Sequence, residues 1–565
     1  MKLSALDLAI IGAYLSAILY IALRTRRYAS RNLENYFLGG RSMPGWMTGI
    51  SYAASMMSAD SAVAYGGLAA ITGAYVCWFY LSRFGIALFF GAVLFAVFWK
   101  RLNTFTTLEF YELRFTGTPA ALLRLWFALR TSLIAMVAWT GISLLALVKL
   151  ADPILGWGKT ETLLAVIPLA VGYVYLAGYR GVVISNLLQV AVMIVGAAVL
   201  AVKALVAAGG PSALGARLPL QATSLFPPGD DVTFPAVACV AWLIGTSVGY
   251  GGDAAPMGGA VEGQRILSSR SPAEACKMYI VAEVTLFLLV FLVSAPCLAA
   301  PLFWPELRNG AMDRELAYGL LMTQFLGPGL LGLVFVAMLG GVIAVIGDNL
   351  NFGSQVLLND VYRRYLVRNA SDRHYFLAGR ASIFVILALA LLVVYRVAFL
   401  FDVAIFMVGL SAAEMTANWA QWWWWRFNGW ARLAASAGGA AIYIAIRLLA
   451  PELPWWTRLA VASGATTGLW VLVSLATPPE PEELLRRFHA RVNPPGLWPW
   501  SRDFASIARG IPIALAGAGA VMAAIVGLSA AYIGRNMAAL ICLGAAAVLA
   551  LIFRRAFQPY LARLT

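Results

Sequence analysis

The apolar stretch at residues 45–67 largely determines the predicted fold, and it reads GWMTGISYAASMMSADSAVAYGG. Small and hydroxyl side chains fill it, and its one ionisable residue, Asp60, lies 15 residues from its start, roughly 22 Å along a helix. A carboxylate inside a membrane span is costly and is by default a functional candidate. The hydroxyls of Ser58 and Ser61 favour a locally opened backbone, although close packing of small residues produces the same composition. We therefore predict a broken membrane helix with Asp60 near the break.

The whole chain has the composition of a membrane protein. Of its 565 residues, 61% are hydrophobic and 12% are charged, whereas soluble domains are about 45–50% apolar and about 25% charged. This difference excludes an ordinary soluble enzyme, a disordered protein and a secreted disulfide scaffold. The apolar runs predict an all-α polytopic membrane protein of about 15 helices, at about 20 residues per span. Besides 45–70, these runs lie near residues 6–23, 74–99, 119–150, 162–178, 182–207, 234–250, 276–300, 319–357, 380–396, 397–420, 433–450, 456–476, 511–530 and 537–553.

The distribution of positive charge predicts the orientation. The 41 Lys and Arg residues outnumber the 26 Asp and Glu residues, which gives a net charge of +15. The basic residues occur in short clusters between apolar runs, which argues against a nucleic-acid partner and is typical of cytoplasmic loops in a lipid bilayer. Because the clusters follow odd-numbered spans, we expect a multi-pass protein of the plasma (inner) membrane with its N-terminus outside and its C-terminus in the cytoplasm.

Cysteine and histidine give no sign of a metal centre. The five cysteines are scattered, and the two histidines, His374 and His489, both lie in basic linkers. We therefore expect no disulfide framework, no organic cofactor and no metal ligand set, apart from sodium as a coupling ion.

A second interrupted span is predicted at residues 234–250. It continues into residues 251–259, where Pro256 and four glycines do not suit a continuous helix. Broken spans are tolerated only where the backbone lines a cavity or is buried in protein. Two such spans, five apart in the series, match the inverted-repeat transporter pattern, in which half-helix ends and unwound carbonyls form a site at mid-membrane.

A solute would bind between the two broken spans. Polar contacts would come from Asp60 and Ser61, and aromatic rings with polar tips suit sugars and nucleosides. The same aromatic residues suit ordinary core packing. The candidate solute-binding residues are Asp60, Ser61, Trp139, Trp242, Ser247 and Tyr250.

Other charged residues lie inside predicted spans. Arg130 could pair with Asp60 or with a solute anion, although a structural ion pair explains it equally well. Glu283 lies close enough to the cytoplasmic end of its span to be interfacial. Asp348 and Glu414 lie toward the cytoplasmic ends of their spans, where they would line an exit path.

Four short motifs occur in order along the chain: YFLGGR at 36–41, GVVISNLLQ at 181–189, EGQRILSSRS at 262–271, which reads as a loop, and LNDVYRR at 358–364. With these motifs, roughly residues 5–475 of the sequence resemble the sodium:solute symporter family. The tail RFHARVNPPG at 487–496 resembles a bacterial branch of that family with poorly defined substrates.

The resemblance implies a LeuT-like core of two inverted five-helix repeats. It also implies a symporter that imports a small polar organic solute, such as a sugar, nucleoside or carboxylate, by alternating access driven by sodium. The expected parts are an N-terminal extra helix (1–30), the first repeat (43–207), the second repeat (234–420), two accessory helices (433–476), a cytoplasmic linker with a short helix at 482–491 (477–510), and two C-terminal helices with a basic tail (511–565).

The sodium site that the resemblance implies is incomplete in this sequence. The matching positions are Ala54, Met57, Gly341, Ala344 and Val345. Ala344 and Val345 stand where the family has two hydroxyl residues, so that only main-chain carbonyls remain. Sodium is a hard cation that needs oxygen ligands, and we therefore expect weaker sodium dependence than is usual in the family. Asp60 or Asp348 would have to contribute to a rearranged site.

Several alternatives stay open. Asp60 or Asp348 could instead couple transport to protons, because a buried carboxyl can hold one, or exchange could be independent of ions. A membrane sensor that keeps the transporter fold would also fit the loss of the two hydroxyls. A polytopic membrane enzyme is disfavoured, because the short outer loops hold no cluster of acidic, His or Arg residues.

Overall fold

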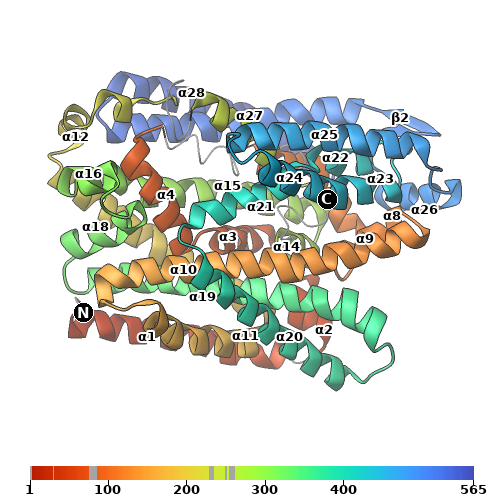
Figure 1. The fold of residues 1–565 in the computed structure, drawn as a ribbon, viewed down its shortest axis with the longest axis horizontal. Helices are drawn as coiled ribbons and strands as arrows, with labels where there is room; N and C mark the ends of the chain where they lie inside the picture. Colours follow the sequence, from red (N-terminus) through yellow and green to blue (C-terminus); the bar gives the residue numbers. More distant parts are fainter. Residues whose placement is uncertain are drawn as a thin grey trace.

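The computed structural model describes residues 3–29, 31–75, 86–227, 235–247, 251–253 and 261–564. The molecule is a bundle of helices, most of which lie side by side along the horizontal axis of Figure 1, with α1 (Ala5–Ala29) at one edge and α27 (Ala505–Tyr532) and α28 (Asn536–Ala562) at the opposite edge. The described residues include 11 helices that are long and apolar enough to cross a membrane. A bent pair, Ala87–Leu102 with Thr107–Arg114, raises the number to 12.

About 15 spans were expected, and the smaller number counts only long, apolar helices among the described residues. The run 45–70 is interrupted, 162–178 joins 182–207 end to end, and 234–250 is described only at residues 235–247. Part of 74–99 lies outside the described residues. Hydropathy registers how apolar a run is, but it does not register where the helix is interrupted.

The second span along the chain, residues 45–70, is broken as predicted. Helix α3 (Gly45–Met56) ends before Met57, and α4 (Ala59–Thr72) begins after Ser58. Met57 (φ −130°, ψ 99°) and Ser58 (φ −128°, ψ −159°) both have extended backbones.

In the seventh span, residues 234–250, the described helix is α13 (Ala236–Ser247), and residues 251–253 beyond it are not helical. Residues 262–271, which the sequence analysis treats as a loop, are mostly helical, because α14 spans Val261–Ser268. Every residue of α14 is buried, and a segment with no water contact satisfies its backbone polar groups most simply as a helix. Ser271 then caps α15 (Pro272–Ser294) by accepting a hydrogen bond from the backbone N–H of Glu274.

Two helices pack against the broken second span, and α1 packs against both of them. Helix α11 (Lys159–Ala207) lies against both α1 and α19 (Leu330–Val356) (Figure 1). It kinks at Gly178 (φ 58°, ψ 174°), a backbone conformation that favours glycine. The Asp7 carboxylate of α1 accepts hydrogen bonds from the backbone N–H groups of Gly329 (2.7 Å) and Gly332 (2.6 Å). A negative charge at a helix N-terminus is stabilising, so this contact fixes α1 against the start of α19.

The remaining α-helices complete the bundle. They are α2 (Leu33–Leu38), α6 (Ala87–Phe90), α7 (Ala96–Leu102), α8 (Phe110–Arg114), α9 (Gly117–Leu129), α10 (Met136–Leu155), α12 (Pro211–Arg217), α16 (Ala300–Phe303), α17 (Glu306–Asn309), α18 (Ala317–Phe325), α20 (Asp372–Arg396), α21 (Leu400–Ala412), α22 (Met415–Trp423), α23 (Gly429–Leu433), α24 (Gly439–Leu449) and α25 (Trp455–Ala476). Four π-helical segments lie within or at the ends of these helices, at Gly91–Phe95, Arg130–Ala135, Leu357–Leu366 and Ala434–Gly438.

The linker between α25 and α27 contains the expected short helix, α26 (Glu482–Val492). A small antiparallel hairpin of β1 (Gly496–Trp498) and β2 (Ser501–Asp503) follows it. The linker is docked on the bundle, since the Glu480 carboxylate accepts hydrogen bonds from the backbone N–H groups of Thr116 (3.0 Å) and Gly429 (2.9 Å). Burial raises the pKa of the Glu480 carboxyl above its usual value, against the opposing effect of these hydrogen bonds.

Candidate functional site

Asp60 lies in the first turn of α4, directly after the break in the second span. Its Oδ1 accepts hydrogen bonds from the Ser58 hydroxyl and from the Ser58 backbone N–H, the latter at 3.2 Å. The start of a helix favours a negative charge, and the side chain is only partly buried. No cation among the described residues pairs with Asp60, so the carboxylate remains available to a solute or an ion.

The other candidate solute residues are placed less favourably. Ser61 is buried, and its hydroxyl donates to the carbonyl of Met56 (3.2 Å) at the end of α3. Trp139 is half-buried on α10. Trp242 packs edge-on against Trp455 of α25, with ring centroids 5.6 Å apart, which accounts for its burial by packing. The side chain of Ser247 and the whole of Tyr250 lie outside the described residues.

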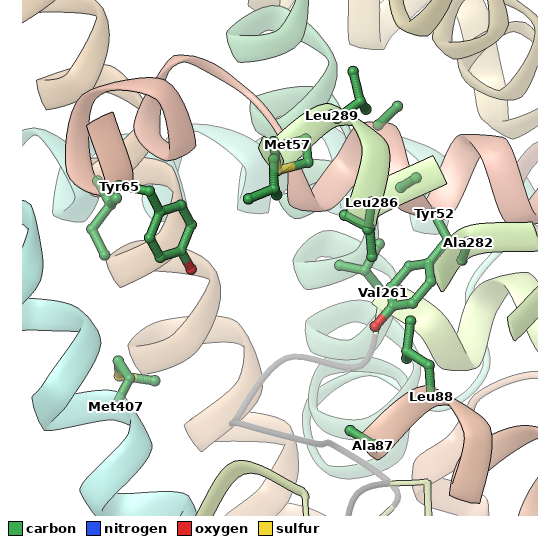
Figure 2. Close-up of a cluster of buried hydrophobic side chains, with 14 of the residues drawn as sticks. Tyr52, Met57, Tyr65, Ala87, Leu88, Val261, Ala282, Leu286, Leu289 and Met407 are labelled. Atoms are coloured by element: carbon green, nitrogen blue, oxygen red, sulfur yellow. The ribbon is translucent and has the colours of Figure 1, made fainter. Parts of the chain in front are cut away.

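Both halves of the broken second span nevertheless meet α14 and α15 in one buried cluster. Figure 2 shows Tyr52 of α3, Met57 at the break and Tyr65 of α4 in one hydrophobic cluster with Val261 of α14 and Leu286 of α15. The Tyr52 hydroxyl also donates to a carboxylate oxygen of Glu262 on α14 (2.8 Å). The broken second span is therefore in direct contact with α14 and α15, the helices that follow the second interrupted stretch along the chain.

The break packs closely against α19 and α11. A Cβ on Gly341 would lie 3.1 Å from the Cα of Ser58 and 2.8 Å from the Nε2 of Gln189. Glycine at this position therefore allows α19 to approach the extended backbone.

The candidate sodium site offers main-chain oxygens but no side-chain oxygen from Ala344 or Val345. Both of these side chains are buried and apolar. The Ala54 carbonyl already accepts a hydrogen bond from the Met57 backbone N–H (3.4 Å). Because sodium needs several oxygen ligands, this set of groups fits only weak binding.

Asp348 is part of a buried ion pair that sequence reasoning missed. Arg265 of α14, with 0% of its side chain exposed, donates from Nη2 to Asp348 Oδ2 at 2.7 Å. The Asp348 carboxylate, 2% exposed, also accepts a hydrogen bond from the hydroxyl of Ser55 on α3. The expectation that Asp348 lines an open exit path is therefore wrong in this conformation. The sequence did contain a signal for this ion pair. Arg265 is the single basic residue in 254–269, and a buried cation needs an acidic partner.

A second buried network agrees with one of the alternatives left open for Arg130, a structural ion pair. Arg130 pairs with Glu414 and not with Asp60. Arg432 of α23 pairs with Glu414 at 3.0 Å and with Asp253 at 3.2 Å. All four charged side chains are buried, so Glu414 joins helices and does not line an exit path.

The described part of the second break has its carbonyls satisfied by side chains. Trp99 Nε1 donates to the Gly251 carbonyl (2.5 Å). The Gly252 carbonyl accepts from Gln421 Nε2 (2.6 Å) and Trp422 Nε1 (2.7 Å). These two carbonyls thus accept hydrogen bonds from indole and amide N–H groups, whereas unwound carbonyls were expected to face the solute.

Glu283, which was expected near the cytoplasmic end of its span, is buried within the protein. The residue is 2% exposed on α15, and its Oε2 has no hydrogen-bond partner among the described residues. The helix continues in both directions beyond it.

Comparisons with known proteins agree with this architecture. A model of the sodium:solute symporter family matches residues 36–424. The sodium/glucose cotransporter of Vibrio parahaemolyticus is 24% identical over 419 residues, covering 69% of this chain and 75% of that protein. The sodium/mannose cotransporter of Bos taurus is 24% identical over 427 residues, or 69% of each chain.

Among solved structures, the substrate-bound, outward-open state of a Na+-coupled sialic acid symporter shares the fold. The TM-score is 0.70 at 18% sequence identity, and the match covers 84% of this chain and 98% of that one. The family model matches most of the length of the chain, and the helical membrane architecture agrees with that match. The chain therefore belongs to the sodium:solute symporter family.

Proposed function

We propose that this protein imports a small polar organic solute by alternating access, and that sodium drives the uptake through a weakly binding site. The observation that carries the proposal is the break at Met57 and Ser58, with the partly exposed Asp60 carboxylate in the first turn after it. A helix N-terminus, an extended segment and an unpaired carboxylate form a polar site inside an apolar bundle.

The solute class is inferred from the candidate site and its relatives. Asp60 and Ser61 supply polar contacts, and Trp139 with the region of Ser247 and Tyr250 supplies further contacts around them. Relatives are described as transporting glucose, mannose and sialic acid, and a sugar, nucleoside or carboxylate suits these groups. The core repeats are assigned to 43–207 and 234–420, with the N-terminus outside and the C-terminus in the cytoplasm.

Sodium is the proposed coupling ion, bound by carbonyls of Ala54, Met57 and Gly341. The absence of hydroxyls at Ala344 and Val345 predicts a shallow dependence of transport on sodium concentration. Asp348 is less suited to carry a coupling proton, because its carboxylate is paired with Arg265.

The test combines binding and flux. Purified protein is screened against a solute library by thermal shift, and each stabilising solute is then offered in radiolabelled form to proteoliposomes with a sodium or a potassium gradient. We expect concentrative uptake, with a modest advantage for sodium. Binding without flux would support a sensor instead, and conversion of the solute would support an enzyme.

The Asp60→Asn substitution tests the site itself. Asp60 accepts hydrogen bonds only within its own loop, so the variant should fold with a nearly unchanged melting temperature. It should lose the solute-dependent thermal shift and the uptake. Normal solute binding by this variant would remove Asp60 from the site, and steep saturation by low-millimolar sodium in the unaltered protein would contradict the weak-site argument.

A further inference from the structure

The Arg265 guanidinium lies where three elements meet on one side of the broken second span. Its Nη2 lies 2.7 Å from Asp348 Oδ2 of α19, 2.5 Å from the Ser55 hydroxyl of α3 and 3.3 Å from the Ser51 hydroxyl of α3. Arg265 itself belongs to α14, beyond the second break. One cation on α14 therefore contacts both the broken second span and α19.

We propose that Arg265 acts as a built-in cation beside the candidate sodium site, where it links α3 to α19 in place of a sodium ion. The inference rests on the proposed function for the role of sodium, which it deepens, because a built-in cation accounts for a weak dependence on that ion. Its geometry rests on the described contacts. Asp348 is three residues beyond Val345 on α19, roughly 5 Å along the helix. The guanidinium is thus about one turn from the positions where the family's two hydroxyls are replaced.

The electrostatics of Asp348 explain why a cation must be present. An isolated carboxylate buried in a low-dielectric interior is strongly disfavoured, whereas a paired and hydrogen-bonded one is tolerated. Arg265 and Ser55 supply that pairing from within the chain. A coupling ion would supply it only when bound, so its concentration would control how firmly α3 and α19 are joined. With Arg265 in place, the junction forms without the ion.

The cluster extends to the supporting helix α11. Asn186 Nδ2 donates to the Ser51 hydroxyl at 2.9 Å and to the Ser51 carbonyl at 3.3 Å. The Tyr179 hydroxyl lies 2.8 Å from the Ser268 hydroxyl at the end of α14. Movement of α3 away from α19 and α11 therefore has to break the hydrogen bonds that Ser55 makes with Asp348 and Arg265, together with those that Ser51 makes with Asn186.

The first experiment asks whether sodium can take over when the guanidinium is removed. In Arg265→Gln, Asp348 becomes a free carboxylate close to the carbonyls of the candidate sodium site. We expect sodium, compared with potassium, to raise the melting temperature of this variant clearly more than that of the unaltered protein. The double variant Arg265→Gln/Asp348→Asn should lose this gain, and Arg265→Lys, which keeps a cation, should not show it.

The second experiment asks whether the pair closes the junction. Ala344 is buried one turn above Asp348, and a cysteine at this position reports access through its rate of maleimide labelling, with the labelled peptide identified by mass spectrometry. We expect slow labelling in the Ala344→Cys background. Adding Ser55→Ala, which removes a hydroxyl but no charge, should raise the rate at least about tenfold, because it weakens a buried charged network. Adding Arg432→Gln, which breaks an equally buried pair elsewhere, should not.

The outcomes separate this inference from the proposed function, because neither experiment contains a solute. Absence of uptake would contradict the proposed function while these two readouts still stand. Equal sodium stabilisation in the unaltered protein and Arg265→Gln would overturn the inference. Equal labelling rates with and without Ser55→Ala would also overturn it. If Arg265→Gln does not fold, the labelling experiment alone tests the inference.

Discussion

The ion pair of Arg130 with Glu414 provides a test at the scale of single residues. Both side chains are buried, and removing one partner leaves an uncompensated charge. We therefore expect Arg130→Gln to lower the free energy of unfolding by about 3–5 kcal/mol, seen as a lower melting temperature in detergent. Arg486→Gln is the matched control, because Arg486 is 59% exposed in a surface pair with Glu482 that is worth about 0–1 kcal/mol. Equal losses in the two variants would contradict this account.

Single residues were predicted as unusual, but their partners were not. The sequence singled out Arg130, Glu414 and Asp348 because charge is rare inside spans. It could not show that Arg130 meets Glu414 across 284 positions, since no local pattern encodes such a distant contact. Arg265 was missed for a different reason, because its short segment reads as a loop until burial on all sides is known.

The contact of α19 with the break provides a test at the scale of elements. An alanine at Gly341 would press its Cβ against Ser58 and Gln189, and overpacking of this kind costs about 1–3 kcal/mol. We expect Gly341→Ala to weaken solute-dependent stabilisation several-fold in the thermal-shift assay, because the extended segment must move. The control is Gly172→Ala in α11, where a Cβ meets nothing within 4 Å. Unchanged solute binding in Gly341→Ala would show that the break tolerates the displacement.

Elements were predicted well where composition changes abruptly. The break near Asp60 follows from small and hydroxyl residues and is present between α3 and α4. Fewer long helices than the roughly 15 expected spans are present among the described residues, because an interrupted run such as 45–70 forms two shorter helices. The satisfied carbonyls of Gly251 and Gly252 depend on Trp99, Gln421 and Trp422 from distant helices, which only the tertiary structure reveals.

Orientation in the bilayer is a property of the whole molecule. Figure 1 shows α16 and α18 at the end opposite α26, in agreement with the alternation of acidic and basic loops. We predict that a cysteine replacing Glu483 on α26, which is 76% exposed, reacts with an impermeant maleimide only in inside-out vesicles. A cysteine replacing the exposed Asn309 on α17 should react only in right-side-out vesicles. The reverse pattern would invert the proposed topology.

The linker has a consequence for how the whole molecule can move. One carboxylate, that of Glu480, accepts hydrogen bonds from the N–H groups at the beginnings of α9 and α23, and the Trp425 backbone N–H donates to the Leu497 carbonyl of the hairpin (3.0 Å). Segments joined by such hydrogen bonds are expected to move as one rigid unit. A force applied to the hairpin would therefore move α9 and α23 together.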